Sequence, residues 1–276
     1  MRIKECEVEM GRKLSWRRAL VTGASEGIGE AFGRELASRG SDLVLVARRR
    51  ERLERLASEL AAESGIEAEV LAADLTDPEG LAAVEARLEV DERPVDLLVN
   101  NAGGASQHRP FLELDRDTLA DDLYLNALAL LRLTHAGAVA MAERGGGSVL
   151  NVSAGVAFYP LPGAAAYGAS KAFVNNLSEA LGHELRDAGV RVTAVCPGFT
   201  HTAAQRRLGM NVESIPSLLW MEAEEVATAA VRAAERGRAL SSLSTIGRIN
   251  AFLGRHLPHR LLLPLLARGQ LRLAGR

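Results

Sequence analysis

From Trp16 onward, apolar segments of strand length alternate with amphipathic segments of helical period. The apolar runs are mostly continuous and rich in Leu and β-branched residues, which is typical of a parallel sheet covered on both faces. These predicted strands span residues 19–22, 43–47, 67–72, 95–99, 148–152 and 191–196. Helical patterns span residues 27–39, 49–63, 78–90, 116–142, 168–188 and 222–236. Asp77 and Pro78 suit the N-cap and the first position of the third helix.

This alternation predicts an α/β fold. Repeated strand–helix–strand units imply right-handed crossovers and a doubly wound, Rossmann-like parallel sheet. We expect one domain over residues 16–245, because no repeat or low-complexity linker marks a second one. A polar leader at residues 1–15, in which Met10 is an alternative start, precedes this domain. A basic, amphipathic extension at residues 246–276 follows it.

Composition and charge exclude several classes of protein. The 33 basic and 35 acidic side chains give a formal net charge of −2, which argues against a nucleic-acid-binding protein. An apolar content of 47% excludes disorder as the main state. Cys6 and Cys196 are far apart and no His or Cys spacing suits a metal, so we expect a cytoplasmic protein without a metal site. We recognise neither a signal peptide nor a long uninterrupted apolar run, and expect at most peripheral membrane contact.

The first strand leads into a glycine-rich turn that opens a helix, with glycines at positions 23, 27 and 29. Such glycines let backbone N–H groups approach a pyrophosphate at a helix N-terminus. The spacing is Gly-x-x-x-Gly-x-Gly, and by itself it also suits a tight turn that needs positive φ. The motif is therefore a nucleotide-binding candidate that needs support from the rest of the chain.

Polar residues follow the next three predicted strands. Arg48, Arg49 and Arg50 stand where an acidic residue would bind the ribose hydroxyls of NAD. A guanidinium there suits a 2′-phosphate and favours NADP, with Arg48 as the ligand, although arginines also suit the start of a solvated helix. Asp74 suits either an adenine amino group or a turn. Asn100–Gly103 places amides and small residues where a ligand can come close.

Tyr167 and Lys171 are four residues apart on one face of a predicted helix. A phenol has a pKa near 10 and is a poor acid–base catalyst at neutral pH, and a neighbouring ammonium should lower that pKa. After residue 13 the chain uses arginine for every fixed cation except Lys171. Because arginine is a poor substitute for a compact ammonium, we expect this lysine to have a chemical role.

Taken together, these motifs resemble the short-chain dehydrogenase/reductase family, and they follow one another in the order that the family has, from residue 16 to about 205. The motifs are Thr22–Gly29, Asn100–Gly103, Asn126, the Tyr167/Lys171 pair and Pro197-Gly198. The resemblance implies a seven-stranded Rossmann fold and NAD(P)-dependent interconversion of a carbonyl and an alcohol. It implies that Tyr167 donates the proton in reduction and that Lys171 holds the nicotinamide ribose and lowers the tyrosine pKa. Asn126 would hold a water that links Lys171 to solvent. The arginine after Ala47 resembles the NADP-preferring members.

The resemblance also implies the cofactor-binding residues. They are Gly23, Ser25, Glu26, Gly27, Ile28, Gly29, Arg48, Asp74, Leu75, Asn101, Ala102, Gly103, Tyr167, Lys171, Pro197, Gly198, Thr200 and Thr202. The segment from residue 197 to 202 would flank the nicotinamide amide. A homo-oligomer, dimer or tetramer, is expected by the same analogy.

One position departs from the family pattern. The serine that hydrogen-bonds the substrate carbonyl stands thirteen residues before the tyrosine, and Ala154 occupies that position here. Ser153 is one residue early, and such a shift on a strand end points a side chain to the opposite face. Either a bulged strand end brings Ser153 in as a catalytic residue, or the carbonyl lacks this donor at a cost of about 10²–10³ in rate.

Two further segments bear on substrate and partners. The loop 199–221 carries Met210, Val212, Ile215 and the run 218–221, which favours either a hydrophobic substrate, acyl, lipid-like or steroid-like, or ordinary loop packing. After Glu235 the chain has eight arginines and no acidic residue, so the preceding part has a net charge of −10. Membrane-surface contact, docking on an acidic body or subunit, and covering of a substrate channel all suit this tail.

The sequence therefore predicts an NADP(H)-dependent reductase of a hydrophobic ketone or aldehyde. The alternative from another class is a catalytically weak or non-catalytic nucleotide-binding sensor or scaffold, which Ala154 alone supports. A related isomerase or dehydratase shares the same motifs.

Overall fold

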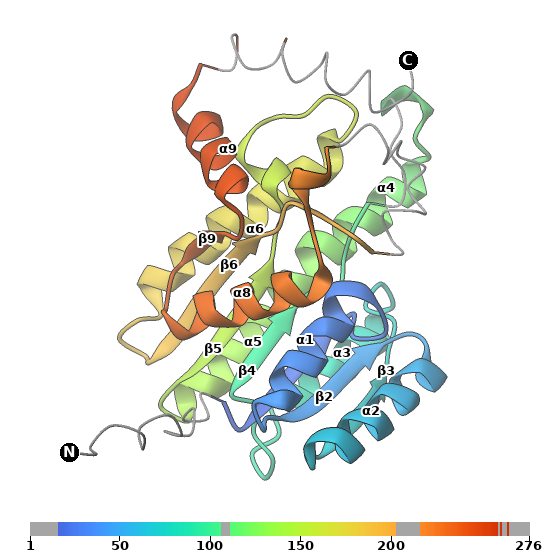
Figure 1. Ribbon diagram of the computed structural model, residues 1–276. Coiled ribbons are helices and arrows are strands. Elements are labelled where there is room, and N and C mark those ends of the chain that lie inside the picture. Colours follow the sequence, from blue (N-terminus) through green and yellow to red (C-terminus); the bar gives the residue numbers. More distant parts are fainter. Residues whose placement is uncertain (1–15, 106–110, 203–215, 259, 261–263, 265–276) are drawn as a thin grey trace, which may run out of the picture.

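The computed structural model describes residues 16–105, 111–202, 216–258, 260 and 264. Seven parallel strands form one sheet in the order β3-β2-β1-β4-β5-β6-β9 (Figure 1). The strands are Arg18–Thr22 (β1), Asp42–Ala47 (β2), Ala68–Ala72 (β3), Leu97–Asn100 (β4), Gly147–Val152 (β5), Val190–Cys196 (β6) and Leu240–Ser242 (β9). This confirms the predicted single-domain Rossmann-like fold.

Helices cover both faces of this sheet (Figure 1). One face carries α1 (Gly27–Ser38), α2 (Arg50–Ser64) and α8 (Ala223–Glu235). The other carries α3 (Pro78–Leu88), α5 (Leu130–Glu143) and α6 (Ala165–Glu184). The remaining elements are η1 (Phe111–Glu113), α4 (Arg116–Leu123), η2 (Tyr124–Ala129), η3 (Gly155–Phe158), β7 (Phe199–Thr200), η5 (Ser217–Leu219), β8 (Trp220–Met221) and α9 (Thr245–His256).

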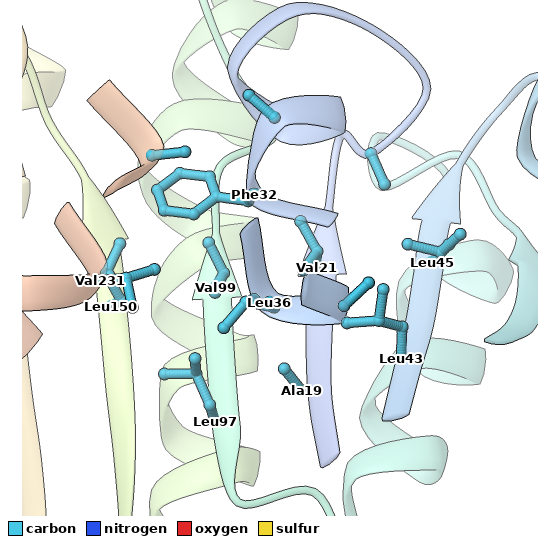
Figure 2. Close-up of a cluster of buried hydrophobic side chains, with 14 of the residues drawn as sticks. Ala19, Val21, Phe32, Leu36, Leu43, Leu45, Leu97, Val99, Leu150 and Val231 are labelled. Carbon is cyan, nitrogen blue, oxygen red and sulfur yellow. The ribbon is translucent and has the colours of Figure 1, made fainter. Parts of the chain in front are cut away.

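Apolar side chains fill the space on both sides of the strands. Val21 of β1 packs in a cluster with Phe32 and Leu36 of α1 (Figure 2), whereas its neighbour Leu20 belongs to the cluster on the opposite face, with Leu133 of α5. All five of these side chains are at most 1% exposed. Burial of successive strand residues on opposite faces explains why the strands have continuous apolar runs.

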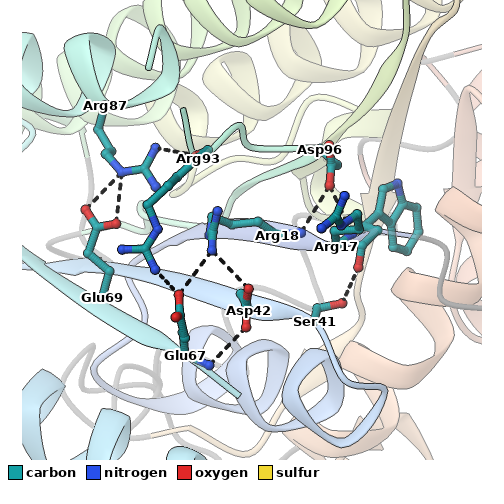
Figure 3. A network of polar contacts seen from close by, with 10 residues as sticks. Arg17, Arg18, Ser41, Asp42, Glu67, Glu69, Arg87, Arg93 and Asp96 are labelled. Carbon is teal, nitrogen blue, oxygen red and sulfur yellow. Dashed lines mark hydrogen bonds and ion pairs between the residues drawn. The ribbon is translucent and has the colours of Figure 1, made fainter. Parts of the chain in front are cut away.

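Ion pairs tie the amino ends of the strands together (Figure 3). Arg18 at the start of β1 contacts the carboxylate of Asp42, the first residue of β2, at 2.9 Å and that of Glu67, just before β3, at 3.3 Å. The Asp96 carboxylate, just before β4, accepts from the backbone N–H groups of Arg17 and Arg18. These contacts consolidate the edge opposite the carboxyl ends, where ligands bind in open parallel sheets.

The structure adds elements that the sequence pattern did not assign. The resemblance implied a seventh strand, and it is β9. The helix predicted from residue 116 is interrupted by η2, a π-helical segment that contains Asn126. Helix α6 begins at Ala165, three residues earlier than predicted, so Tyr167 lies in its first turn. Asp77 caps α3 as predicted, because its carboxylate accepts from the backbone N–H of Gly80 at 3.0 Å.

The helical run from Arg116 to Glu143 is long and apolar enough to cross a membrane by length and composition. In the fold, 56% of its most apolar window is buried, and α5 packs on the sheet as a core helix. The predicted polar leader lies outside the described residues, as do Met210, Val212 and Ile215 of the apolar loop 199–221 (the lid).

Candidate active site

The glycine loop lies at the carboxyl edge of the sheet, between β1 and α1. Gly23 and Gly27 have positive φ angles, +67° and +60°. A Cβ at Gly23 would lie 2.8 Å from the amide nitrogen of Asn101, and one at Gly29 would lie 2.1 Å from the Gly23 carbonyl oxygen. The predicted loop therefore needs glycine for its backbone angles and for the close approach of neighbouring segments.

Thr22 and Asn101 join this loop to the end of β4. The Thr22 hydroxyl accepts from the backbone N–H groups of Asn101 and Ala102, both at 3.0 Å. The Asn101 side-chain amide donates to the Thr22 carbonyl at 2.9 Å. These contacts bring the predicted cofactor residues Asn101 and Ala102 against the glycine loop.

Arginines from the start of α2 lie on the outer side of the loop. The Glu26 carboxylate pairs with Arg49 at 2.8 Å and with Arg52 at 3.3 Å, and Arg49 also donates to the Ser25 hydroxyl at 3.1 Å. Sequence reasoning selected Arg48 from three consecutive arginines and did not predict these contacts. The three consecutive arginines look alike in the sequence, so nothing in it indicates which of them contacts the glycine loop.

Arg48 and Asp74 lie at the ends of β2 and β3. The Arg48 side chain is 76% exposed, and its guanidinium is 3.8 Å from the Asp74 carboxylate. The Asp74 carboxylate accepts from the backbone N–H and the hydroxyl of Thr76, as in a turn. Burial opposes ionisation of Asp74, but these hydrogen bonds hold its pKa below the usual value. Leu75 is buried in the core.

Gly103, Asn126 and Lys171 meet at the end of β4. A Cβ at Gly103 would lie 2.5 Å from the Asn126 side-chain oxygen and 3.5 Å from the Lys171 nitrogen. Asn126 is held by Gly104, whose N–H donates to its side-chain oxygen at 2.9 Å and whose carbonyl accepts from its amide at 2.6 Å. The structure thus brings together three of the predicted residues from distant parts of the chain.

Tyr167 and Lys171 lie on one side of the first turns of α6. The Lys171 nitrogen is 5.8 Å from the centre of the Tyr167 ring and donates to the Val152 carbonyl at 2.9 Å. Burial raises the pKa of Tyr167 to about 12, and burial lowers the pKa of Lys171 to about 8. The net pKa of Tyr167 therefore lies above the ordinary value and not below it as expected, because burial of the phenol dominates and the charge of Cys196 raises it further.

Ser153 follows the carboxyl end of β5 and bonds to helix α6. Its side chain is buried, and its hydroxyl donates to the Lys171 carbonyl at 3.1 Å. The backbone pairing of β5 with β6 continues regularly, since the Ser153 N–H donates to the Val195 carbonyl. The strand end therefore has no bulge at Ser153, the Ser153 hydroxyl bonds to α6, and Ala154 follows it without a hydroxyl.

The segment predicted to flank the nicotinamide follows β6. The Pro197 carbonyl accepts from the Gly155 N–H at 3.1 Å, and the Thr200 hydroxyl donates to the Gly198 carbonyl at 3.2 Å. A Cβ at Gly27 would lie 3.2 Å from the Thr202 methyl group. Residues 197–202 therefore connect the end of β6 with the glycine loop.

These residues fit a nicotinamide dinucleotide. The glycine loop opens α1 without side chains at positions 23, 27 and 29, which leaves backbone N–H groups accessible to phosphate. Arg48 offers an exposed guanidinium at the end of β2, where the adenosine ribose of such a cofactor would lie. The Tyr167/Lys171 pair lies on α6, where the nicotinamide would lie. No group of three His, Cys, Asp or Glu that could hold a metal lies among the described residues.

A family model described as short chain dehydrogenase matches residues 17–213. The chain belongs to this family. The family's enzymes are oxidoreductases that use a nicotinamide cofactor, and the motif order agrees with the fold and the positions described above.

Individual relatives are similar over most of the chain. A very-long-chain 3-oxoacyl-CoA reductase of Anas platyrhynchos is 34% identical over 67% of this chain and 60% of its own length. An inactive hydroxysteroid dehydrogenase-like protein 1 of Homo sapiens is 32% identical over 68% of this chain and 57% of its own length. The match thus spans about three fifths of the length of these curated relatives.

Among solved structures, a short-chain dehydrogenase from Sphingobium yanoikuyae in complex with NADPH is 41% identical, with a TM-score of 0.78. The similarity covers 86% of this chain and 92% of that chain. The family member and this protein therefore share almost the whole domain.

Gly103→Ala should disrupt the meeting of Asn126 and Lys171. Gly103 and Gly104 both have φ of +148°, but an added Cβ at Gly104 would have no atom within 4 Å. Backbone strain is therefore common to both variants, and only Gly103→Ala forces Asn126 away. We expect kcat/KM to fall by about tenfold or more with Gly103→Ala beyond the effect of Gly104→Ala. Steady-state kinetics with thermal unfolding of both variants measures the difference, and equal losses would contradict it.

Proposed function

We propose that this protein is an NADP(H)-dependent oxidoreductase that interconverts a carbonyl and an alcohol on a hydrophobic substrate. The observation that carries the proposal is the convergence of Asn126, Lys171 and the end of β4 at Gly103, with Tyr167 one helical turn from the lysine. The lysine is buried, and its nitrogen lies 5.8 Å from the centre of the Tyr167 ring. Burial of that amine opposes its charge and requires compensating contacts.

The side chains suit carbonyl reduction at neutral pH. A bound nicotinamide supplies the hydride. Tyr167 has a pKa of about 12 and therefore holds the proton that the carbonyl oxygen needs. Lys171 has a pKa of about 8 and is mostly an ammonium at neutral pH, so it offsets the negative charge on the phenolate as the proton leaves. Asn126, held by Gly104, is proposed to hold a water that links Lys171 to solvent.

NADP(H) is the proposed cofactor. Three consecutive arginines follow β2 in place of an acidic residue, and Arg48 is exposed at the strand end. Arg49 and Arg52 add positive charge beside the glycine loop, although Glu26 pairs with both. The NADPH complex of the 41% identical relative supports the same choice.

The proposed substrate is an acyl, lipid-like or steroid-like carbonyl compound. The lid carries several large apolar residues, and its described part includes Trp220, which contacts Phe199 and stacks on His201 with ring centres 4.3 Å apart. The 3-oxoacyl-CoA reductase among the relatives supports a long acyl chain. A steroid-like ketone suits the same apolar lid.

The alternative function is that of a catalytically weak or non-catalytic nucleotide-binding protein. Ala154 favours it, because the carbonyl then lacks a hydroxyl donor, and one similar relative is named inactive. Retention of Asn126, Tyr167 and Lys171 favours the enzyme.

We also propose a cytoplasmic homo-oligomer. Leu123, Leu128, Leu131 and Val139, on the helical run from α4 to α5, are between 36% and 53% exposed. Phe173 on α6 is 39% exposed. Apolar surface of this kind suits contact with a second copy, and light scattering measures the mass in solution.

Tyr167→Phe tests the proposed chemistry directly. The variant keeps the ring and loses the hydroxyl that carries the transferred proton, so kcat for NADPH-dependent ketone reduction should fall by about 10²-fold or more. Oxidation of NADPH with a panel of long-chain and cyclic ketones measures it, and NADPH binding should persist. Turnover indifferent to this change, or no turnover with any ketone, would favour the non-catalytic alternative.

Ala154→Ser should supply the absent carbonyl donor. Since one donor of this kind is worth about 10²–10³ in rate, we expect kcat to rise, by up to about 10²-fold. Ser153→Ala is the matched control one residue away, and it should leave kcat nearly unchanged because its hydroxyl bonds to the Lys171 carbonyl. If Ser153→Ala lost turnover and Ala154→Ser gained none, Ser153 would be the residue that donates to the substrate carbonyl.

Arg48→Ala should weaken NADPH binding selectively. Removal of a charged hydrogen bond to the 2′-phosphate should raise KM for NADPH by about 10- to 100-fold, with little change in KM for NADH. Arg50→Ala is the matched control, because Arg50 faces Glu54 along α2 at 3.8 Å. Equal effects on both cofactors would contradict Arg48 as the phosphate ligand.

A further inference from the structure

Helix α9 packs on the body of the protein through its small residues. Gly247, Ala251 and Gly254 are spaced to lie on one side of the helix. A Cβ at Gly247 would lie 2.4 Å from the Ser242 hydroxyl, and one at Gly254 would lie 2.5 Å from the Phe158 carbonyl. The glycines therefore let the helix backbone rest directly on β9 and η3.

Ile246 and Leu253 of α9 are partly buried, but two other large apolar residues of the helix are exposed. Ile249 is 54% exposed and Phe252 is 63% exposed, and Leu257 at the C-cap is 39% exposed. Positions 249 and 252 are three residues apart on the side opposite the glycines, and Leu257 follows the helix at its extended C-cap. An ordinary surface helix buries its large apolar residues, so this helix presents the face that usually seeks a partner. It stands at the end of the molecule beyond β6 and β9 (Figure 1).

Positive charge flanks this apolar face. Arg248 and Arg255 are exposed on α9, and Arg260 follows it. Arg248 donates to the Thr245 hydroxyl, and Arg255 pairs with Glu179 of α6 at 2.6 Å. The sequence has no acidic residue after Glu235, so the tail itself adds no carboxylate, and Glu179 of α6 is the acidic partner of Arg255.

We propose that the outer face of α9 docks on an anionic lipid bilayer. Ile249, Phe252 and Leu257 would enter the boundary between headgroups and acyl chains, with the helix in the membrane plane. Arg248 lies beside them, so its aliphatic stem would cover apolar surface while its guanidinium reaches a lipid phosphate. Arg255 also borders this face, although its guanidinium pairs with Glu179. Exposed apolar area bordered by arginine is the combination that binds an anionic bilayer surface.

A second copy of the chain is a poorer occupant of this face. The net charge of −10 before residue 236 would attract these cations, but a bilayer also offers an apolar interior for Ile249 and Phe252. The surface on α4, α5 and α6 offers exposed apolar residues for self-association without this cationic border.

Vesicle flotation with the full-length protein tests the proposal. We expect flotation with vesicles of phosphatidylcholine and phosphatidylglycerol, much less with phosphatidylcholine alone, and a decrease as salt rises. The double variant Ile249→Ser/Phe252→Ser should lower the partition coefficient by about tenfold or more. Phe111→Ser/Leu112→Ser is the matched control, because it removes side chains that are 61% and 97% exposed on η1, away from α9.

Arg248→Gln adds a test of the charge. It should weaken binding to the anionic vesicles and leave the small affinity for phosphatidylcholine unchanged. Thermal unfolding and light scattering of all variants separate membrane binding from folding and assembly. Wild-type protein that does not float with anionic vesicles, or flotation equally reduced in both double variants, would overturn the proposal. A lower oligomeric mass confined to the α9 variant would assign the face to a second copy instead.

Discussion

Close packing of backbone segments at the carboxyl edge of the sheet is the constraint on which the site depends. Parallel strands joined by helical crossovers all end at this edge, so the loops after β1, β4 and β6 must share a small space. Gly23, Gly29 and Gly103 resolve the crowding, since a Cβ at each would lie 2.1 to 2.8 Å from a neighbouring polar atom. The same absence of side chains leaves backbone N–H groups accessible and lets Asn126 and Lys171 meet at Gly103.

Burial of an amine at this edge has to be compensated by the strand beneath it. Lys171 is 4% exposed, and its nitrogen donates to the Val152 carbonyl at the end of β5. A chain of buried amides supports this arrangement, because Asn100 of β4 donates to Asn151 of β5, which donates to Ser178 of α6. Since buried polar groups are costly without partners, these bonds specify how α6 sits on the sheet. Since Tyr167 lies in the first turn of α6, the same bonds also fix where its phenol lies.

Much of this organisation was predictable, and the reasons are local. The strands were found because burial on both faces demands continuous apolar runs, as at Leu20 and Val21. The Tyr167/Lys171 pair was found because helical spacing places such residues on one side. The π-helical segment around Asn126 was not predicted, because it accompanies side-chain bonds to Gly104, 22 residues away. The contacts of Arg49 and Arg52 with Glu26 likewise depend on how α2 approaches the glycine loop.

By itself the sequence determined the fold class, the motif order, the residue types of the site and the separation of an acidic body from a basic tail. Only the tertiary structure decided that the Ser153 hydroxyl turns to the Lys171 carbonyl, that burial raises the pKa of Tyr167, and that α9 exposes Ile249 and Phe252. The physical reason is the same in each case. Spacing along a chain defines which side of a strand or helix a residue occupies, whereas desolvation and hydrogen-bond partners are set by segments that only folding brings together.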